Sequence, residues 1–472
     1  MAILSRRIGF ILFVIFLSSS ISISSLSFSP SDDYLVNCGS DVDSTVDNRR
    51  FVSDASSKVK FFSSEGSVSL QGEDLAPNVP QIYRTARVFT RQAKYEFNVR
   101  EKGTHMVRLH FNRLTSSKID LNGAEFHVTV NGHVVLRNFN GTSSNKVREF
   151  LIWVGVGEVV VRFVPSKDSK LAFVNAIEVI SAPKDLIADV ATSVSGDGTG
   201  KVNGLAKQAM EVMYRINVGG RKVTPFNDTL WRTWLPDDDL FKSLGGSSSR
   251  KAYFTGRIKY RPGGASREVG PDNVYNTARV GNVMSWDFPV STGYKYLIRM
   301  HFCDIASKSL GLLYFNVYIN GNSAYQDFDI SDSTGYVLAS PYYMDFVVDL
   351  TADSNNPSGS SIRVSVGSSN KTSVDERGVD AMLNGVEIMK MNNSMGSLDG
   401  FVSTDMILTS CPNRRNLSIF IAMMAFMCIF MSFYVVVQRK KVRDDVFNWT
   451  KLPMDVPQDN LKSGNQFAAR KP

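Results

Sequence analysis

The densest group of side chains that could do chemistry lies at positions 231–239, where two tryptophans precede three consecutive aspartates. The stretch reads Trp-Arg-Thr-Trp-Leu-Pro-Asp-Asp-Asp. Carboxylate oxygens are the ligands that Ca²⁺ prefers, but consecutive residues rarely converge on one ion without further ligands. We therefore interpret this segment as a solvated loop tethered by two buried tryptophans, and we expect no metal site.

The histidines and arginines that could do chemistry are also expected to have structural roles. His110 and His301 each precede a phenylalanine, and no H-E-x-x-H or paired C-x-x-C motif accompanies them. We predict that both are hydrogen-bonded histidines of the core. Arg87 and Arg279 are expected to pair with carboxylates inside the fold. Residues 196–200 lack the strand and helix of a phosphate-binding loop and are interpreted as linker. We predict no cofactor and no catalytic residue.

The net charge of +8 is concentrated at the two ends of the chain. Eight Lys or Arg against four Asp follow Gln438, and Arg6 and Arg7 lie near the N-terminus. The long segment between them is therefore close to neutral. A nucleic-acid partner would need a concentrated basic face, so we expect none.

An unbroken apolar run at 417–437 is followed at once by Gln-Arg-Lys-Lys-Val-Arg. About twenty apolar helical residues cross the hydrocarbon core of a bilayer, so we predict a single transmembrane helix. Residues 1–27 show the basic, apolar and small-residue order of a secretory signal peptide; an uncleaved anchor is the alternative. Together with the basic cluster after the helix, this predicts an extracellular N-terminus.

Cysteines and glycosylation motifs suit an extracellular segment. Cys38, Cys303 and Cys411 lie before the membrane run and Cys428 within it. Three is an odd number, so at least one outer thiol is expected to be free or to pair between chains. Four N-x-S/T motifs are predicted to be glycosylated on exposed loops, at Asn140, Asn227, Asn370 and Asn392.

The extracellular segment contains two copies of one sequence unit. Five motifs recur in the same order, about 190 residues apart, which is the size of a domain. We infer a tandem duplication. The paired motifs begin at Tyr34 and Tyr214, Tyr83 and Tyr275, Arg108 and Arg299, Phe126 and Phe315, and Asn175 and Asn384.

The local pattern within each copy predicts β-strands. Apolar and polar residues alternate in 126–130, and Asn131-Gly132 follows as a type I′ hairpin signal. Further strands are expected at 159–163, 294–302 and 361–366. We predict two all-β sandwich domains. The expected organisation is signal peptide 1–27, first domain 28–192, linker 193–209, second domain 210–392, juxtamembrane segment 393–416, helix 417–437 and disordered cytosolic tail 438–472.

These repeated motifs closely resemble the tandem malectin-like ectodomain of the plant receptor-kinase family that includes FERONIA and THESEUS. The resemblance extends from about Tyr34 through the membrane helix. It implies two malectin-type β-sandwiches at the plasma membrane, sensing cell-wall polysaccharide or secreted peptides. Fold analogy alone does not identify a ligand.

The resemblance also indicates candidate contacts for a ligand. Malectin itself holds a glucose disaccharide with an aromatic pair, but 111–116 and 302–307, which match that segment, both lack the pair. Tyr83 and Tyr275 align with a tyrosine of malectin's ligand face and are the candidate ligand-binding residues. A partly buried strand tyrosine is the alternative for both.

Members of that family carry a kinase domain after the membrane helix, whereas about 35 residues follow Val437 here. No Gly-rich loop, strand lysine or catalytic aspartate can be placed on them. We therefore expect a kinase-less receptor-like protein that acts as co-receptor or competitor of a full-length relative. A wall-to-membrane carbohydrate tether is the alternative function. A glycosidase would need two carboxylates at a fixed separation, which the sequence does not indicate.

Overall fold

The computed structural model describes residues 28–448, except 58, 64–65, 74, 143–145, 156, 243–248, 351–359, 372–380 and 411–413. The predicted signal peptide, Cys411 and the tail beyond 448 lie outside the described residues. The chain forms two compact units, one ending at Ser410 and one beginning at Cys411. The first unit contains both predicted sandwich domains; we call it the ectodomain, because the sequence predicts that it lies outside the membrane.

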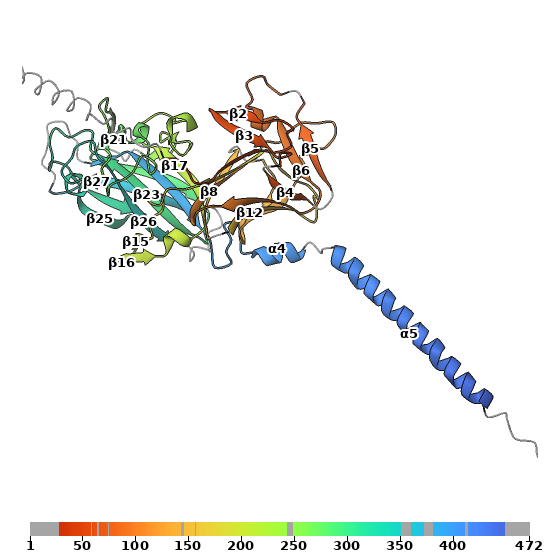
Figure 1. Ribbon diagram of the computed structural model, residues 1–472. Helices are drawn as coiled ribbons and strands as arrows, with labels where there is room; N and C mark the ends of the chain where they lie inside the picture. Colours follow the sequence, from red (N-terminus) through yellow and green to blue (C-terminus); the bar gives the residue numbers. More distant parts are fainter. Residues whose placement is uncertain are drawn as a thin grey trace, which may run out of the picture. The chain divides into compact units, whose positions relative to one another are not determined.

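A single twisted sheet runs through both halves of the ectodomain (Figure 1). Among the described residues it has 13 strands. The N-terminal half contributes, in spatial order, β2 (Ser44–Val46), β3 (Arg49–Ser53), β1 (Asp33–Asn37), β14 (Ala176–Ser181), β8 (Gly103–His110) and β11 (Val147–Val154). The C-terminal half continues with β17 (Met210–Asn217), β29 (Gly385–Met391), β23 (Lys295–Cys303), β26 (Pro341–Asp349), β15 (Val190–Ser195) and β16 (Gly198–Asn203), and β18 (Leu235–Pro236) pairs with β17.

The two halves meet where β11 pairs with β17. Phe150 lies opposite Glu211 and Leu151 opposite Met210 in an antiparallel ladder. This pairing joins the two predicted domains through backbone hydrogen bonds instead of a flexible connection. We call this continuous layer the shared sheet.

Each half completes its own β-sandwich with separate sheets. In the N-terminal half they contain β10 (His133–Phe139), β9 (Phe126–Val130), β12 (Gly157–Pro165), β7 (Ala93–Val99) and β4 (Lys60–Ser63), and β13 (Ala172–Val174), β6 (Thr85–Phe89) and β5 (Ser67–Gln71). In the C-terminal half they contain β19 (Phe241–Lys242), β22 (Val283–Val290), β27 (Ser360–Ser368), β24 (Tyr314–Ile319) and β25 (Asn322–Asp329), and β20 (Ser249–Tyr253), β21 (Thr277–Gly281) and β28 (Ala381–Leu383).

Two faces of the shared sheet bury different residues. Along β8, Val107 and Leu109 enter the core of the first sandwich, while Met106 packs on the opposite face. That opposite face gathers apolar residues from both halves, including Leu151, Met210, Leu297 and Met389. The alternation follows from the two-residue period of a strand.

The predicted strands and hairpins are confirmed. Strands β9, β12, β23 and β27 correspond to the four predicted segments, with β23 beginning at Lys295, one residue after the predicted start. Asn131 and Gly132 have φ of 46° and 85°, as a type I′ turn between β9 and β10 requires. Asn320 and Gly321 repeat this geometry between β24 and β25, with φ of 52° and 82°.

The segment indicated as a linker, 193–209, is largely regular. Strands β15 and β16 form a hairpin around Gly196-Asp197, and β15 pairs in parallel with β26 of the second sandwich. Its glycines allow the tight turn, while the flanking residues complete the sheet. A 3₁₀ turn, η2 (Leu205–Lys207), then leads into β17.

Residues 393–410 form a strap that returns from the second sandwich to the first. Leu398 is fully buried in the core of the first sandwich. Its backbone N–H donates to Val134 O at 2.8 Å, and Thr404 Oγ1 donates to Gly132 O at 2.8 Å. The strap ends in helix α4 (Thr404–Ser410).

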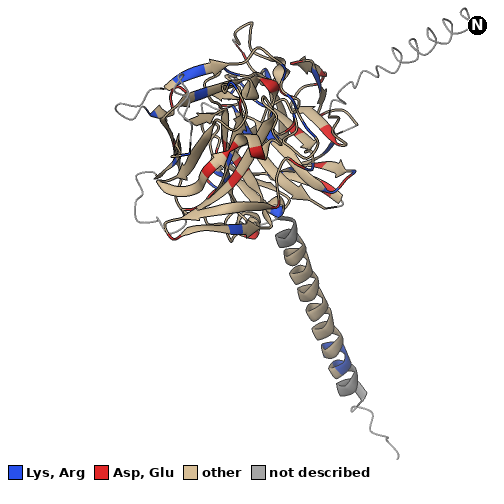
Figure 2. Ribbon diagram, turned by 90° about the vertical axis from the view of Figure 1, so that its left-hand side faces the viewer, with Lys and Arg blue, Asp and Glu red and all other residues tan. Residues whose placement is uncertain are grey.

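The remaining helices of the ectodomain are short. They are η1 (Gln81–Tyr83), η3 (Pro225–Asn227), α2 (Asp272–Tyr275) and α3 (Ile330–Ser333). The second unit is the long helix α5 (Arg414–Asn448), whose 419–443 portion has the length and apolar character to cross a membrane. It contains the predicted span and continues through 438–448, which the sequence placed in a disordered tail. Figure 2 shows the basic band near its C-terminal end.

We predict that Leu398→Ala lowers the free energy of unfolding of the ectodomain by about 2–5 kcal/mol, because it leaves a cavity in a core formed by a distant part of the chain. Denaturant unfolding of the full chain, followed by tryptophan fluorescence, measures this change. Met395→Ala, in the exposed part of the same strap, is the matched control. Equal effects of the two variants would contradict the role assigned to the strap.

Candidate functional site

The two candidate tyrosines occupy equivalent positions in a motif that is built twice. Tyr83 O–H lies 2.9 Å from His110 Nδ1, and His110 Nε2 lies 2.9 Å from Glu178. In the second half, Tyr275 pairs with His301 at 2.9 Å, and His301 with a glutamate, Glu387, at 3.2 Å. Both histidines are thus hydrogen-bonded core histidines, as predicted.

The two copies of this motif differ in access. Tyr275 is fully buried and packs in a small cluster with Ile258, Val269 and Cys303. Its side chain therefore offers no surface to a ligand, which speaks against the contact suggested by the resemblance. Tyr83 is half-buried in η1 and lines a groove.

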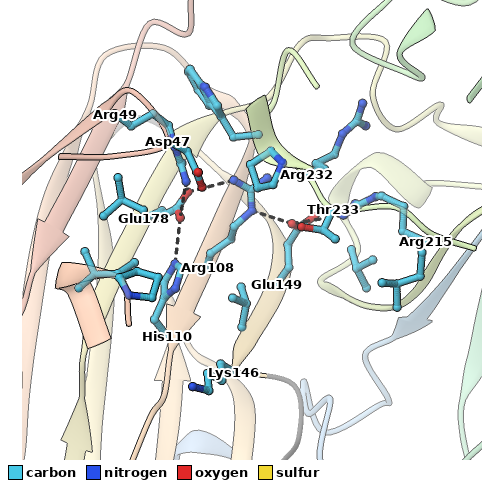
Figure 3. A pocket seen from close by; sticks show the side chains of 18 of the residues that line it. Asp47, Arg49, Arg108, His110, Lys146, Glu149, Glu178, Arg215, Arg232 and Thr233 are labelled. Atoms are coloured by element: carbon cyan, nitrogen blue, oxygen red, sulfur yellow. Dashed lines mark hydrogen bonds and ion pairs between the residues drawn. The ribbon is translucent and has the colours of Figure 1, made fainter. Parts of the chain in front are cut away.

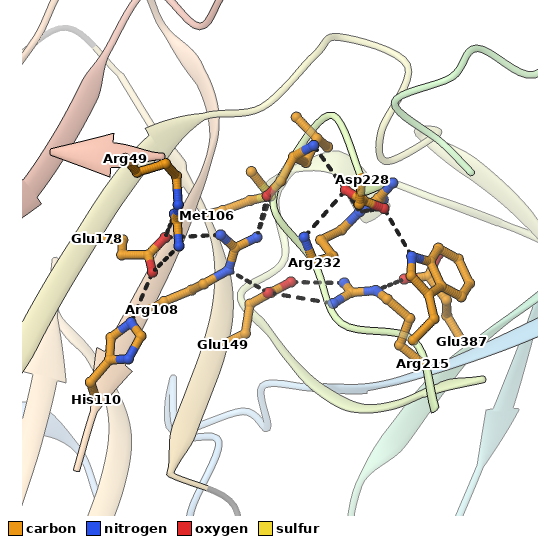
Figure 4. Close-up of polar contacts among 12 residues, drawn as sticks. Arg49, Met106, Arg108, His110, Glu149, Glu178, Arg215, Asp228, Arg232 and Glu387 are labelled. Atoms are coloured by element: carbon orange, nitrogen blue, oxygen red, sulfur yellow. Dashed lines mark hydrogen bonds and ion pairs between the residues drawn. The ribbon is translucent and has the colours of Figure 1, made fainter. Parts of the chain in front are cut away.

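Beside Tyr83, an alternating chain of buried charges crosses from one half to the other (Figure 4). Arg108 is its centre: Nε donates to Glu149 at 2.7 Å and Nη1 to Glu178 at 3.0 Å. We call it the charge ribbon. Its six members, in order of contact, are Arg49, Glu178, Arg108, Glu149, Arg215 and Glu387.

The ribbon joins the two halves directly. Arg215 of β17 donates to Glu149 of β11 at 2.8 Å and to Glu387 of β29 at 2.8 Å. Arg108 also donates to the backbone carbonyl of Leu230 at 2.7 Å, which fixes the 228–236 loop over the sheet. Glu149 and Glu178 each lie between two guanidiniums, and Glu387 lies between Arg215 and His301, so no ribbon charge is buried without a partner.

Burial and pairing oppose each other in setting the protonation of these acids. Burial raises the pKa of Glu149, but Arg215 and Arg108 outweigh it and lower that pKa to about 2. Arg108, His110 and Arg49 likewise hold the pKa of Glu178 well below its usual value despite burial. Because Glu178 is ionised, His110 Nε2–H donates to it, and in the neutral imidazole Nδ1 then accepts from the Tyr83 hydroxyl.

A groove of about 600 Å³ opens over the ribbon at the junction of the two halves (Figure 3). Its volume lies within the range of about 300–1,000 Å³ typical of ligand pockets. Strand ends of the first half and the 222–235 segment of the second half line it. Its charged lining comprises Asp47, Arg49, Arg108, Lys146, Glu149, Glu178, Arg215, Lys222 and Arg232.

A cationic side chain lies over one face of each of two aromatic rings at the groove. Lys146 Nζ lies 5.3 Å from the centre of the Tyr83 ring, and the Arg49 guanidinium lies 5.3 Å from that of Trp231. Trp231 has φ of 54°, a conformation that bulky side chains rarely adopt. Strained backbone conformations of this kind are common at ligand-binding sites, where the surrounding structure stabilises them.

The 231–239 cluster only partly matches its prediction. Trp234 is fully buried and donates to Asp228 at 2.9 Å, whereas Trp231 is half-buried in the groove wall. The prediction of a solvated loop is wrong for Asp237, which is fully buried. It accepts from Trp286 at 2.8 Å and from Arg279.

The predicted structural role of the paired arginines is confirmed. Arg87 donates to Asp54 at 2.7 Å, and Arg279 pairs with Asp237 and Asp238. Sequence reasoning missed Arg49, Arg215 and the acids of the ribbon, because their partners lie 41 to 172 residues away. No group of three or more metal-ligating side chains occurs within the described residues.

The glycosylation candidates occupy different environments. Asn140, Asn227 and Asn370 are exposed. Asn392 is half-buried, and its side chain accepts from Ala209 N at 3.0 Å. Burial raises the pKa of the thiols of Cys38 and Cys303, which are both free and buried.

A second hollow, of about 630 Å³, lies beside β26 and the β15–β16 hairpin. Tyr325, Tyr342 and Tyr343 line it together with Asp185 and Lys201. Tyr325 is 47% exposed. Aromatic faces beside polar groups are the features with which proteins hold sugar rings.

Comparison with known proteins shows that this chain is similar to plant receptor proteins. The family described as the malectin-like domain matches residues 36–391. A probable receptor-like protein kinase of Arabidopsis thaliana is 42% identical over 78% of this chain and 45% of its own length. Receptor-like protein kinase THESEUS 1 from the same plant is 34% identical over 82% of this chain and 45% of its own length.

Solved structures agree with this result. The plant complex of peptide RALF23 with FER and LLG2 contains a chain that is 30% identical, with a TM-score of 0.64, over 79% of this chain and 98% of that one. The chain spans about half the length of the curated relatives that it matches.

We predict that Glu149→Gln lowers the free energy of unfolding by about 3–5 kcal/mol, because it removes a charge shared by two buried guanidiniums. The folded pKa of Glu149, about 2, is below its ordinary value of 4.5. Its contribution is therefore complete above about pH 4.5 and is lost as the pH falls toward 2. Denaturant unfolding at a series of pH values measures both effects, and the variant should lose part of this pH dependence.

Glu158→Gln is the matched control, because Glu158 pairs with Lys60 on the surface. An exposed pair contributes about 0–1 kcal/mol, so this change should have little effect. If the two variants unfold alike, the ribbon does not hold the halves together.

Proposed function

Because the chain belongs to the malectin-like family of plant receptor-kinase ectodomains, we propose that it is a single-pass plasma-membrane receptor-like protein that binds a secreted peptide. In this proposal the N-terminal ectodomain faces outward, and α5 crosses the membrane. Binding, not catalysis, is the activity assigned to the described residues. A full-length relative is the proposed partner, with this chain acting as co-receptor or competitor.

The groove between the two halves is the observation that carries this proposal. Both sandwiches contribute to its wall, and the shared sheet and charge ribbon fix their relative position. A pre-formed site spends little of its binding energy on ordering the protein. The solved complex of FER with peptide RALF23 and LLG2 supports the class of ligand proposed here.

A bulky side chain introduced into the groove tests the proposal. Thr233 lines the groove and is half-buried, so Thr233→Trp should fill part of it. We predict that the tagged full chain, purified from plant membranes, retains a secreted peptide or a related receptor and that this variant loses it. Quantitative mass spectrometry of the co-purified peptides and proteins measures the loss.

Thr199→Trp is the control, because Thr199 is exposed on β16, outside the groove lining. Retention by both variants would show that the groove is not the binding site. Failure of the wild-type chain to retain any peptide or receptor would count against the function itself.

We propose wall-to-membrane attachment through carbohydrate as a second candidate function, because the tyrosine-lined hollow beside β26 supports it. The hollow and the groove share no lining residue. A sugar ring placed against Tyr325 would gain the contact of an exposed aromatic face.

Tyr325→Ala should reduce retention of the full chain on immobilised cell-wall polysaccharide by about tenfold, since one stacking surface is lost. Affinity electrophoresis measures retention. Tyr336→Ala is the control, because Tyr336 is 61% exposed and lies outside the hollow. Unchanged retention of the Tyr325 variant would exclude this hollow as a sugar site.

A further inference from the structure

The lining of the groove has more positive than negative groups. Six cations and three carboxylates line it. Glu149 and Glu178 are each already shared between two guanidiniums of the ribbon. Lys146 and Lys222 are exposed and, among the described residues, have no carboxylate within ion-pair distance. The groove therefore has cationic groups available for a ligand.

Two buried guanidiniums in this lining also keep unused donors. Arg49 is 8% exposed and Arg232 is 1% exposed. Within the described residues, Arg49 Nε and Arg232 Nη2 have no hydrogen-bond partner. Both atoms have almost no exposed surface, so a ligand cannot reach them, and Lys146 and Lys222 are the exposed cationic groups of the lining.

The aromatic rings favour a carboxylate over a sugar ring. Lys146 covers one face of Tyr83, and His110 packs against the same tyrosine with ring centres 5.7 Å apart. Arg49 covers one face of Trp231. A pyranose needs an uncovered ring face for stacking, whereas a carboxylate needs N–H donors and positive charge.

We infer that the groove binds an acidic peptide segment, whose carboxylates are received by the exposed Lys146 and Lys222. The inference rests on the proposed function and specifies its ligand. The exposed lysines attract the ligand, and the shared sheet and charge ribbon hold the walls of the groove in place. Binding of this kind weakens as salt screens the charges.

The test uses the full chain in lipid nanodiscs and a fluorescein-labelled hexapeptide in which three glutamates alternate with glycine. Matched peptides carry three glutamines or three lysines. We expect the glutamate peptide to bind at least about tenfold more tightly than either, as measured by fluorescence anisotropy. Lys146→Glu and Lys222→Glu should each weaken it, and the double variant should abolish the preference.

Lys102→Glu is the control, because Lys102 is equally exposed but does not line the groove. Equal binding of the glutamine peptide, or indifference to both groove reversals, would overturn the inference. Equal affinity for a trimer of uronic acid would overturn the choice of a peptide as the occupant.

The failure of this inference is distinguishable from failure of the proposed function. Thr233→Trp blocks any ligand of the groove, whereas the lysine reversals act only on an acidic one. If Thr233→Trp removes the co-purified ligand but the glutamate peptide does not bind, the function holds and the acidic ligand is wrong. If the glutamate peptide binds but no secreted peptide or receptor is retained, the proposed function fails alone.

Discussion

Arg108 imposes the constraint on which the rest of the ectodomain depends. A guanidinium that is 3% exposed must meet acceptors on every side, because it can neither lose its charge nor reach water. Its acceptors come from β11, from β14 and from a loop of the other half. These partners can be in place together only if the two sandwiches adopt one arrangement, and this arrangement creates the groove.

The charge ribbon specifies geometry more than it adds stability. Replacing a buried ion pair by apolar residues is often neutral, whereas breaking one is costly. A slip of one residue in the β11–β17 pairing would place Glu149 and Arg215 on opposite faces of the sheet and break the ion pair between the halves. We therefore interpret the ribbon as the feature that sets the register between the halves, while the apolar clusters supply most of the burial energy.

Duplication followed by divergence explains why only one copy of the Tyr–His–Glu motif opens to the surface. Both copies keep the buried carboxylate, the histidine and the tyrosine. In the second copy, Trp234 packs on His301 at 5.3 Å and Tyr260 on Tyr275 at 6.2 Å, which seals that motif. Trp234 belongs to a segment whose neighbouring residues Trp231, Arg232 and Thr233 line the groove beside the first copy, so one segment closes one site and lines the other.

The sequence predicted the local features of this fold and few of the long-range ones. The alternation in 126–130, the Asn-Gly turns and the repeated motifs depend on neighbouring residues, and the structure confirms them. The pairing of Arg215 with Glu149, the return of Leu398 and the closure of Tyr275 depend on contacts between distant segments. A segment rich in glycine, 193–209, resembled a linker because its pairing partner, β26, lies about 150 residues further along the chain.

Hydrogen exchange at the junction of the halves tests the central claim, that the two sandwiches form one body through the shared sheet. Segments 147–154 and 210–217 of the full chain would be compared with β9 and β24, which lie within single sandwiches. The account predicts that the paired amides of β11 and β17 exchange as slowly as those internal strands at low and high salt. Rapid exchange at the junction, with both sandwiches still protected, would show that the halves open independently and would contradict it.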